Sequence, residues 1–230
     1  MIRRAAALLI LLAWSAAAGA ATLPELEARL NADPNDMKAA NEYRKAVIQA
    51  GEYDRAIDFF KKLVTDHPKA AYAWLNYGYT YVDKIPAAGS ITQVILANTA
   101  LTNFTKSIEI ERSWIALFTR GNSYLYWPKI FGRGPLAVTD LEEAVAISKK
   151  GPQKKVYARA WIALGDAYWR TDQPEKAKAT WKEALALFPG HPQLEARLAR
   201  DGEELEKYIY EQLDPNKRVD TNLSPLWEEP

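Results

Sequence analysis

The fold of this chain is decided by residues 159–189. Residues 159–168 are RAWIALGDAY, a polar break TDQP follows at 171–174, and residues 174–189 are PEKAKATWKEALALFP. In both halves, apolar or small residues recur at intervals of three and four, which predicts two amphipathic helices. Pro174 suits the first turn of a helix, and Pro189 suits the position just past a helix end. The stretch therefore predicts two antiparallel helices joined by a short turn.

Small residues mark where these two helices would cross. Gly165 and Ala177 leave room for a close approach, while Trp161, Tyr168 and Trp181 fill the space around them. This W-x-x-L-G-x-x-Y…A…P order resembles the tetratricopeptide repeat, a helix–turn–helix unit of about 34 residues. The resemblance implies an all-α fold, a right-handed superhelical solenoid with a C-terminal capping helix and an extended tail.

The same pattern recurs upstream, with Trp74 and Gly78 in one unit and Gly121 and Tyr124 in the next. In residues 37–70 only the second helix matches well, because Tyr43, Arg44 and Val47 stand where Leu, Gly and Tyr are usual. The alternative is an ordinary helical bundle with chance spacing. We predict a signal peptide at 1–20, an N-terminal half repeat at 21–36, repeats at 37–70, 71–113, 114–157 and 158–191, a capping helix or helix pair at 192–213 and an extended tail at 214–230.

The first residues have the order of a secretory signal peptide. A basic start is followed by an apolar run at 5–14 and by small residues at 15–21. This order predicts cleavage after Ala20 or Ala21 and export to the periplasm or the medium. An uncleaved anchor is the alternative, but the run is shorter than the roughly 20 residues that span a bilayer. Cleavage removes two arginines and no acid, so the charge changes from +1 to −1, and we expect no stable membrane insertion afterwards.

Composition excludes several classes of protein. The chain has 230 residues, of which 48% are hydrophobic and 11% aromatic, too many for a disordered chain. Lys and Arg number 30 against 29 Asp and Glu, which leaves no cationic excess for nucleic acid. Two histidines, no cysteine and no catalytic motif argue against a metal site, thiol chemistry or an enzyme. We therefore predict no catalytic residue, no metal and no cofactor.

The candidate binding surface is the concave face of the solenoid, which the first helix of each repeat lines. Residues that alternate with the packing positions point into it, and in the first repeat this rule selects Asn41, Lys45 and Ile48. Tyr, Trp and Arg are typical anchors of interfaces, although part of the set could instead pack against neighbouring helices. The predicted groove residues of the later repeats are Tyr72, Tyr79, Val82, Phe118, Asn122, Tyr126, Asp166, Trp169 and Arg170.

Two inserted loops and the tail carry unexpected apolar residues. Two adjacent repeats exceed the template, one near residues 82–91 and one at 127–135. Trp127, Ile130 and Phe131 are too apolar for a solvent-exposed loop that has no packing or binding role. They either cover helix ends or form a lip over the groove. In the tail, Leu223, Leu226 and Trp227 are predicted to anchor the segment on its own solenoid or in a partner.

These features favour a non-catalytic, exported scaffold or adaptor that binds a protein or peptide partner in an aromatic groove. The alternative is a periplasmic small-ligand-binding component associated with solute transport. A long open groove would favour the peptide, and a closed pocket would favour the small ligand.

Overall fold

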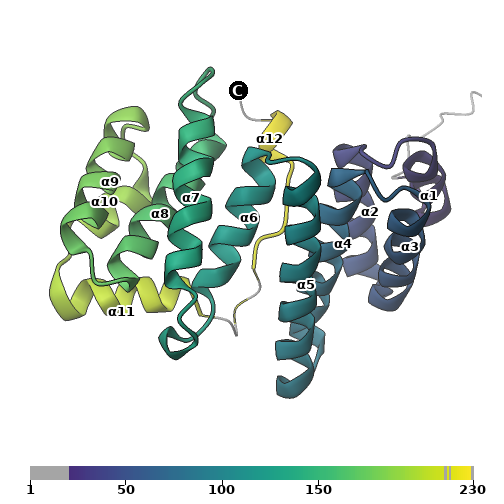
Figure 1. Cartoon of the computed structure of the whole chain (residues 1–230), viewed down its shortest axis with the longest axis horizontal. Helices are drawn as coiled ribbons and strands as arrows, with labels where there is room; N and C mark the ends of the chain where they lie inside the picture. Colours follow the sequence, from purple (N-terminus) through teal and green to yellow (C-terminus); the bar gives the residue numbers. More distant parts are fainter. Residues whose placement is uncertain (1–20, 215–216, 218, 229–230) are drawn as a thin grey trace, which may run out of the picture.

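The protein is a curved row of helices. The structure, a computed structural model, describes residues 21–214, 217 and 219–228, so the predicted signal peptide at 1–20 lies outside the described residues. All regular structure in the described ranges is helical, which confirms the prediction of an all-α helical repeat array (Figure 1). No helix among the described residues is both long enough and apolar enough to cross a membrane.

The helices follow one another as antiparallel neighbours, and α4 with α5, α6 with α7 and α8 with α9 make the most extensive contacts. The α-helices are α1 (Leu23–Ala32), α2 (Met37–Ala50), α3 (Tyr53–Asp66), α4 (Ala71–Lys84), α5 (Ser90–Ile110), α6 (Trp114–Leu125), α7 (Gly134–Ser148), α8 (Ala158–Arg170), α9 (Pro174–Leu187), α10 (Pro192–Leu198), α11 (Gly202–Gln212) and α12 (Pro225–Glu228). Short 3-10 turns are η1 (Ile85–Ala87), η2 (Lys129–Phe131) and η3 (Lys155–Tyr157).

Local chemistry explains several of these boundaries. The carboxylate of Asp36 accepts a hydrogen bond from the Ala39 amide (2.9 Å) and so caps the start of α2. Gly51 ends that helix in the left-handed region, at φ 71°, where glycine is favoured. In the crossing of α8 and α9, a Cβ on Gly165 would lie 2.0 Å from Nε1 of Trp181. The glycine is therefore required for the close approach of these helices.

Two apolar clusters form the core. The N-terminal cluster joins α1 to α4 around Tyr43 and Phe60, and the C-terminal cluster extends from α4 to the tail around Phe104, Trp161 and Trp181. Tyr81 on α4 contacts both clusters. The array therefore has two packed bodies that share α4.

The end of the array, at 192–213, has the helix pair that the sequence leaves open as the alternative to one capping helix. The structure has two helices there, α10 and α11, separated by residues 199–201. Asp201 is extended and accepts a hydrogen bond from the Gly202 amide (2.8 Å), and Gly202 itself has φ 49°. An Asp-Gly pair favours a turn, and this turn divides the segment into two helices.

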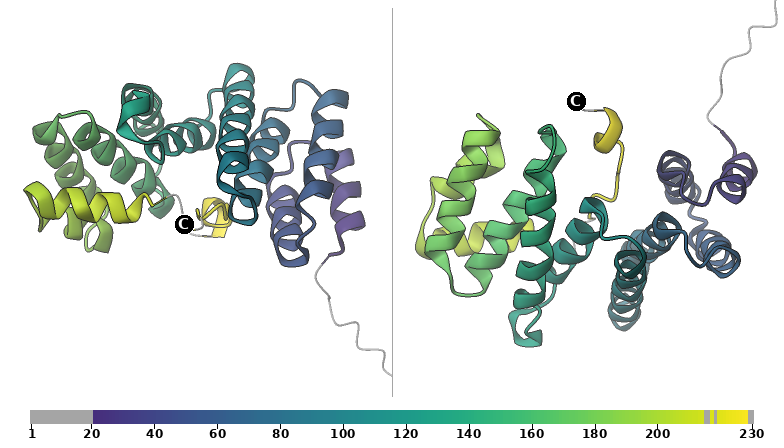
Figure 2. Two further views of the ribbon diagram at one scale, coloured as in Figure 1. Left: turned by 90° about the horizontal axis from the view of Figure 1, so that it is seen from below. Right: turned by 45° about the horizontal axis from the view of Figure 1, so that its top comes forward.

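The tail turns back along the array. Figures 1 and 2 show it leaving the far end of α11 and running towards α12, which lies on the opposite edge of the array from the start of α5. Thr221, Leu223 and Ser224 are buried. The last described segment is thus part of the folded body.

Candidate functional site: the concave groove and the tail

A buried polar network lies in the half of the groove formed by α2 and α4. The side chains of Arg44 and Asp83 are each only 2% exposed, and Nη1 of Arg44 lies 3.1 Å from Oδ2 of Asp83. Nε of Arg44 also donates to Oδ1 of Asn76 (3.1 Å). A buried guanidinium is tolerated only when its charge is paired and its donors have acceptors. These partners hold Arg44 in a fixed orientation that leaves Nη2 facing the groove.

The network binds the main chain of the tail. Nη2 of Arg44 donates to the carbonyl oxygen of Thr221 (2.8 Å), and the amide of Leu223 donates to Oδ1 of Asn41 (2.9 Å). The hydroxyl of Thr221 donates to Oδ1 of Asp83 (2.5 Å). Two of these three bonds use backbone groups of the tail, which every extended segment possesses. This part of the groove therefore has the chemistry to hold an extended peptide.

Side chains of the tail add specificity to this binding. Nζ of Lys45 donates to the hydroxyl of Ser224 (2.9 Å). Leu223 is buried in the C-terminal cluster, and Leu226 and Trp227 are half-buried against it. On the other side, Arg159 forms a more exposed ion pair with Asp220 (3.2 Å). The three predicted tail anchors thus lie on the chain's own solenoid.

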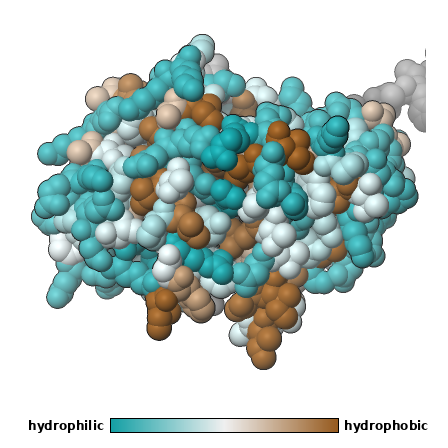
Figure 3. Space-filling view, viewed as in Figure 1, coloured by the Kyte–Doolittle hydropathy of each residue, from teal (hydrophilic) through white to brown (hydrophobic). Residues whose placement is uncertain are grey.

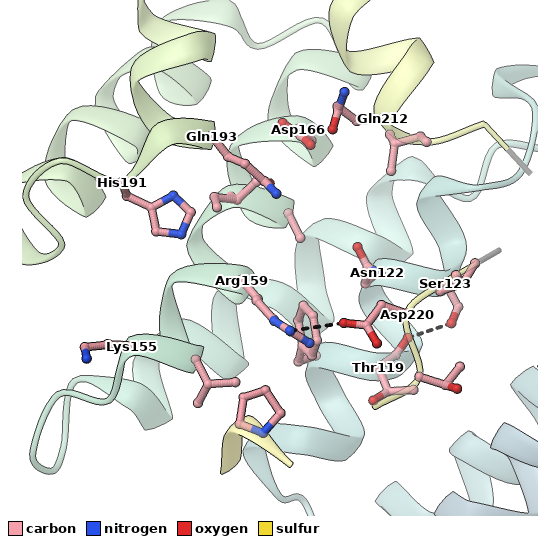
Figure 4. A pocket seen from close by; sticks show the side chains of 18 of the residues that line it. Thr119, Asn122, Ser123, Lys155, Arg159, Asp166, His191, Gln193, Gln212 and Asp220 are labelled. Atoms are coloured by element: carbon pink, nitrogen blue, oxygen red, sulfur yellow. Dashed lines mark hydrogen bonds and ion pairs between the residues drawn. The ribbon is translucent and has the colours of Figure 1, made fainter. Parts of the chain in front are cut away.

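The other half of the groove is open. A cavity of about 820 Å³ lies between the tail and helices α6, α8, α10 and α11. Figure 4 shows Lys155 and Arg159 on one side of it, Asn122 on another, and His191 with Gln193 on a third. Six of the predicted groove residues line the cavity, namely Tyr79, Val82, Phe118, Asn122, Tyr126 and Asp166.

Burial determines which lining groups carry charge. It raises the pKa of the hydroxyls of Tyr79 and Tyr126 and lowers the pKa of His191, so all three are neutral near pH 7. The sequence predicts that Asp166 faces a ligand, but both of its carboxylate oxygens accept from Arg197, at 2.6 and 2.7 Å, and it is buried. Among the cationic lining residues, Arg197 pairs with Asp166 and Arg159 pairs with Asp220, so Lys155 carries the least compensated positive charge of this half.

Three of the groove residues predicted in the later repeats do not line the cavity. Tyr72, in the first turn of α4, donates its hydroxyl to Oε1 of Glu111 (2.9 Å). Trp169 and Arg170 occupy the last turn of α8, where Trp169 packs on the core and Arg170 donates to the carbonyl of Trp127 (2.8 Å). The spacing rule was wrong for these positions because their side chains contact neighbouring segments outside the cavity.

The loop at 127–135 does not line the cavity either. Trp127 is half-buried against the C-terminal cluster, whereas Ile130 and Phe131 are exposed. Trp127 thus covers the end of α6, and the other two residues project into solvent rather than over the groove.

The sequence pattern did not identify Arg44 and Asp83 as residues that hold the tail. The one indication in the sequence was that Arg44 replaces the glycine that is usual at this position of a repeat. A charged side chain at a packing position requires a buried partner, and Asp83 is separated from it by 39 residues. The geometry defines an all-α helical repeat array whose concave groove holds an extended segment.

Comparisons with known proteins agree with this class. Models of the tetratricopeptide repeat match residues 36–70 and 158–201. A solved structure of TTC0263, a thermophilic TPR protein in Thermus thermophilus, is 21% identical, covers 77% of this chain and 87% of its own, and has a TM-score of 0.56. A structure of MamA is 22% identical, with 75% and 91% covered and a TM-score of 0.54. A comparison with curated proteins gave no match.

A third structure, a MamA RS-1 ArsTM double mutant, is 18% identical, with 88% and 93% covered and a TM-score of 0.54. At these identities the likeness concerns the fold. The chain therefore contains tetratricopeptide repeats, within the all-α helical repeat array described above. Repeats of this kind are typically non-catalytic scaffolds for protein interactions.

Proposed function

We propose that this protein is an exported scaffold that binds an extended segment of a protein partner in its groove, at the place where its own tail lies. The observation that carries the proposal is the pair of main-chain contacts made by Asn41 and Arg44. Because these contacts read backbone groups, a segment from another protein can satisfy them equally well. The order of residues 1–20 supports export to the periplasm or the medium.

In this proposal the tail is a resident ligand that competes with the partner. A segment of the same molecule has a high effective concentration at its own site. A partner therefore binds when it offers more contact than the tail does, and the open cavity beside the tail provides the surface for that extra contact.

A synthetic peptide with the sequence of residues 219–230 can take the place of the unidentified partner in a binding test. In the full chain, Leu223→Asp places a carboxylate in a buried apolar site and should free the tail. We expect this variant to bind the fluorescently labelled peptide at least about tenfold more tightly than the wild type does, because its own tail no longer competes. Fluorescence anisotropy measures the affinity.

Two controls make the test specific. Adding Asn41→Ala to the Leu223→Asp chain should abolish peptide binding, and a peptide that itself carries Leu223→Asp should not bind. If the Leu223→Asp chain is folded by circular dichroism and does not bind the native peptide, the groove is not a peptide site and the proposal fails.

The cavity supports a second candidate, a small-ligand-binding component. Its volume of about 820 Å³ falls within the range of ligand pockets. Lys155, together with Arg159 when a ligand replaces Asp220 as its partner, would favour a carboxylate or another anion. Native mass spectrometry of the purified protein should then reveal a bound small molecule that is lost on Arg159→Ala. A wild-type spectrum at the mass of the bare chain, with no thermal shift by small carboxylates, would exclude this candidate.

A further inference from the structure

The two segments that lengthen the repeats project from one edge of the array. Helix α5 has 21 residues against 14 in α4, so it is about 10 Å longer than the helix it pairs with. The α6–α7 connection, which contains η2, lies at the same edge (Figure 1). Neither segment lines the groove cavity at its tip, so the groove does not explain them.

Both projections end in exposed aliphatic or aromatic side chains. Ile91 is 81% exposed and Ile130 is 90% exposed. Ile91, Val94 and Ile95 share one face of α5, since they are three and four residues apart. Figure 3 shows two apolar projections on this edge. The apolar edge, as we name it, consists of Ile91, Val94, Ile95, Ile130, Phe131 and Leu136, all at least half exposed.

The two projections are fixed relative to each other. Nη2 of Arg133 donates to Oδ1 of Asn98 on α5 (2.9 Å), which ties the loop to the helix. The same guanidinium lies 3.6 Å from the ring centroid of Trp127. The two projections therefore form one ordered surface, with Trp127 and Arg133 packed beneath the exposed apolar side chains.

The charge of the apolar edge indicates what it contacts. Residues 84–105 and 126–136 contain Lys84, Lys129 and Arg133 and no acidic residue, although the whole chain is nearly balanced. Lys84 and Lys129 form ion pairs with Asp54 and Asp172 of other segments, which leaves Arg133 as the uncompensated charge. Apolar tips with Trp and basic residues behind them suit the boundary between lipid headgroups and acyl chains.

We propose that the apolar edge binds the surface of an anionic lipid bilayer, with its tips inserted at the headgroup boundary and the body of the array outside. Two separate convex tips match a deformable lipid surface better than the packed centre of a protein interface, which requires complementary shape. In this orientation α12 lies on the edge away from the membrane (Figure 1). The groove can then exchange its tail for a partner while the protein is bound.

Vesicle flotation with the full chain tests this inference. The probes are vesicles of phosphatidylcholine alone and of phosphatidylcholine with phosphatidylglycerol. We expect the wild type to float with the mixed vesicles and to bind the neutral ones more weakly. The double substitution Ile91→Asp and Ile130→Asp should reduce the apparent affinity by at least about tenfold, because each aliphatic side chain buried in lipid contributes that much or more.

A matched control replaces an exposed residue that does not belong to the apolar edge. Tyr210 on α11 is 68% exposed, and Tyr210→Asp should leave flotation unchanged. The inference is overturned if the wild type floats with neither vesicle or if the double variant floats as well as the wild type. It is also overturned if the wild type self-associates in solution and the double variant does not, since a second copy would then cover the edge.

Discussion

The two halves of the groove each contain a buried Arg–Asp ion pair, but only one of the two pairs binds the tail. Each has a buried Arg–Asp pair, Arg44 with Asp83 in the half formed by α2 and α4, and Arg197 with Asp166 in the half near α10. Arg197 directs its remaining contact to the carbonyl of Gln193 in its own helix (3.0 Å), whereas Arg44 directs Nη2 to the tail. A buried ion pair therefore becomes a peptide site only when one donor is left facing the groove.

The largest effects are expected from removing these two arginines. Arg44→Met and Arg197→Met each leave a buried carboxylate without its main partner, which should lower the free energy of unfolding by about 3–5 kcal/mol. Urea unfolding measures both losses. Only Arg44→Met should also free the tail, detected as faster proteolysis within residues 219–228. Equal release of the tail by Arg197→Met would show that the two pairs do not differ in the way described.

A smaller effect is expected from crowding the core of each half. A Cβ on Gly165 would clash with Trp181, and one on Gly78 would lie 2.4 Å from Cε1 of Phe104. Each Gly→Ala change should cost about 1–3 kcal/mol through overpacking. Gly151→Ala is the matched control, because nothing lies within 4 Å of its added Cβ. Thermal unfolding by calorimetry measures the costs, and a Gly165→Ala protein as stable as the control would contradict the close crossing of α8 and α9.

The two contacts at either end of the extended part of the tail should contribute differently to the stability of the protein. Asn41→Ala leaves the buried amide of Leu223 without its acceptor and should cost about 1–3 kcal/mol. Arg159→Ala breaks the more exposed pair with Asp220 and should cost no more than about 1 kcal/mol. Chemical denaturation of the two variants compares them. A larger loss for Arg159→Ala would mean that the open half, and not the network around Arg44, holds the tail.

The smallest expected effect is a pH dependence of stability that arises from His191, in the open half of the groove. Burial lowers the pKa of His191, so the unfolded chain binds its proton more readily than the folded one. Stability should therefore be greatest above the ordinary histidine pKa of about 6.5 and should decline as pH falls below it. His191→Gln should reduce this decline between pH 7.5 and 5.5 in thermal unfolding. An unchanged pH profile would show that His191 is not the group responsible.

The sequence predicts the helices well because their determinants are local. Gly165 and Trp181 lie in adjacent helices of one repeat, so the spacing that predicts the helices also predicts the crossing. The network around Arg44 is different, since Asn41 and Leu223 are separated by 182 residues. No periodicity connects positions that far apart. The sequence therefore identifies the tail as apolar and leaves open whether it packs on its own solenoid or on a partner.

The errors in the groove have a related cause. The alternation rule considers one helix at a time, but Tyr72 bonds to Glu111 and Trp169 packs on the core, so neither side chain lines the cavity. It also cannot distinguish an exposed carboxylate from one that a later helix neutralises, as Arg197 of α10 does for Asp166. Contacts between elements, not the pattern within one element, decide these cases.

The bond between the first repeat and the tail also orders events during synthesis. In a repeat array each unit normally contacts only its neighbours, so the units nearest the N-terminus can fold as soon as they emerge from the ribosome. Here Arg44 of the first repeat obtains its last acceptor, the carbonyl of Thr221, only when almost the entire chain has been made. The final residues thus connect the C-terminal end of the array to its first repeat, and a chain truncated before Thr221 would leave a donor of the buried Arg44 guanidinium without this acceptor.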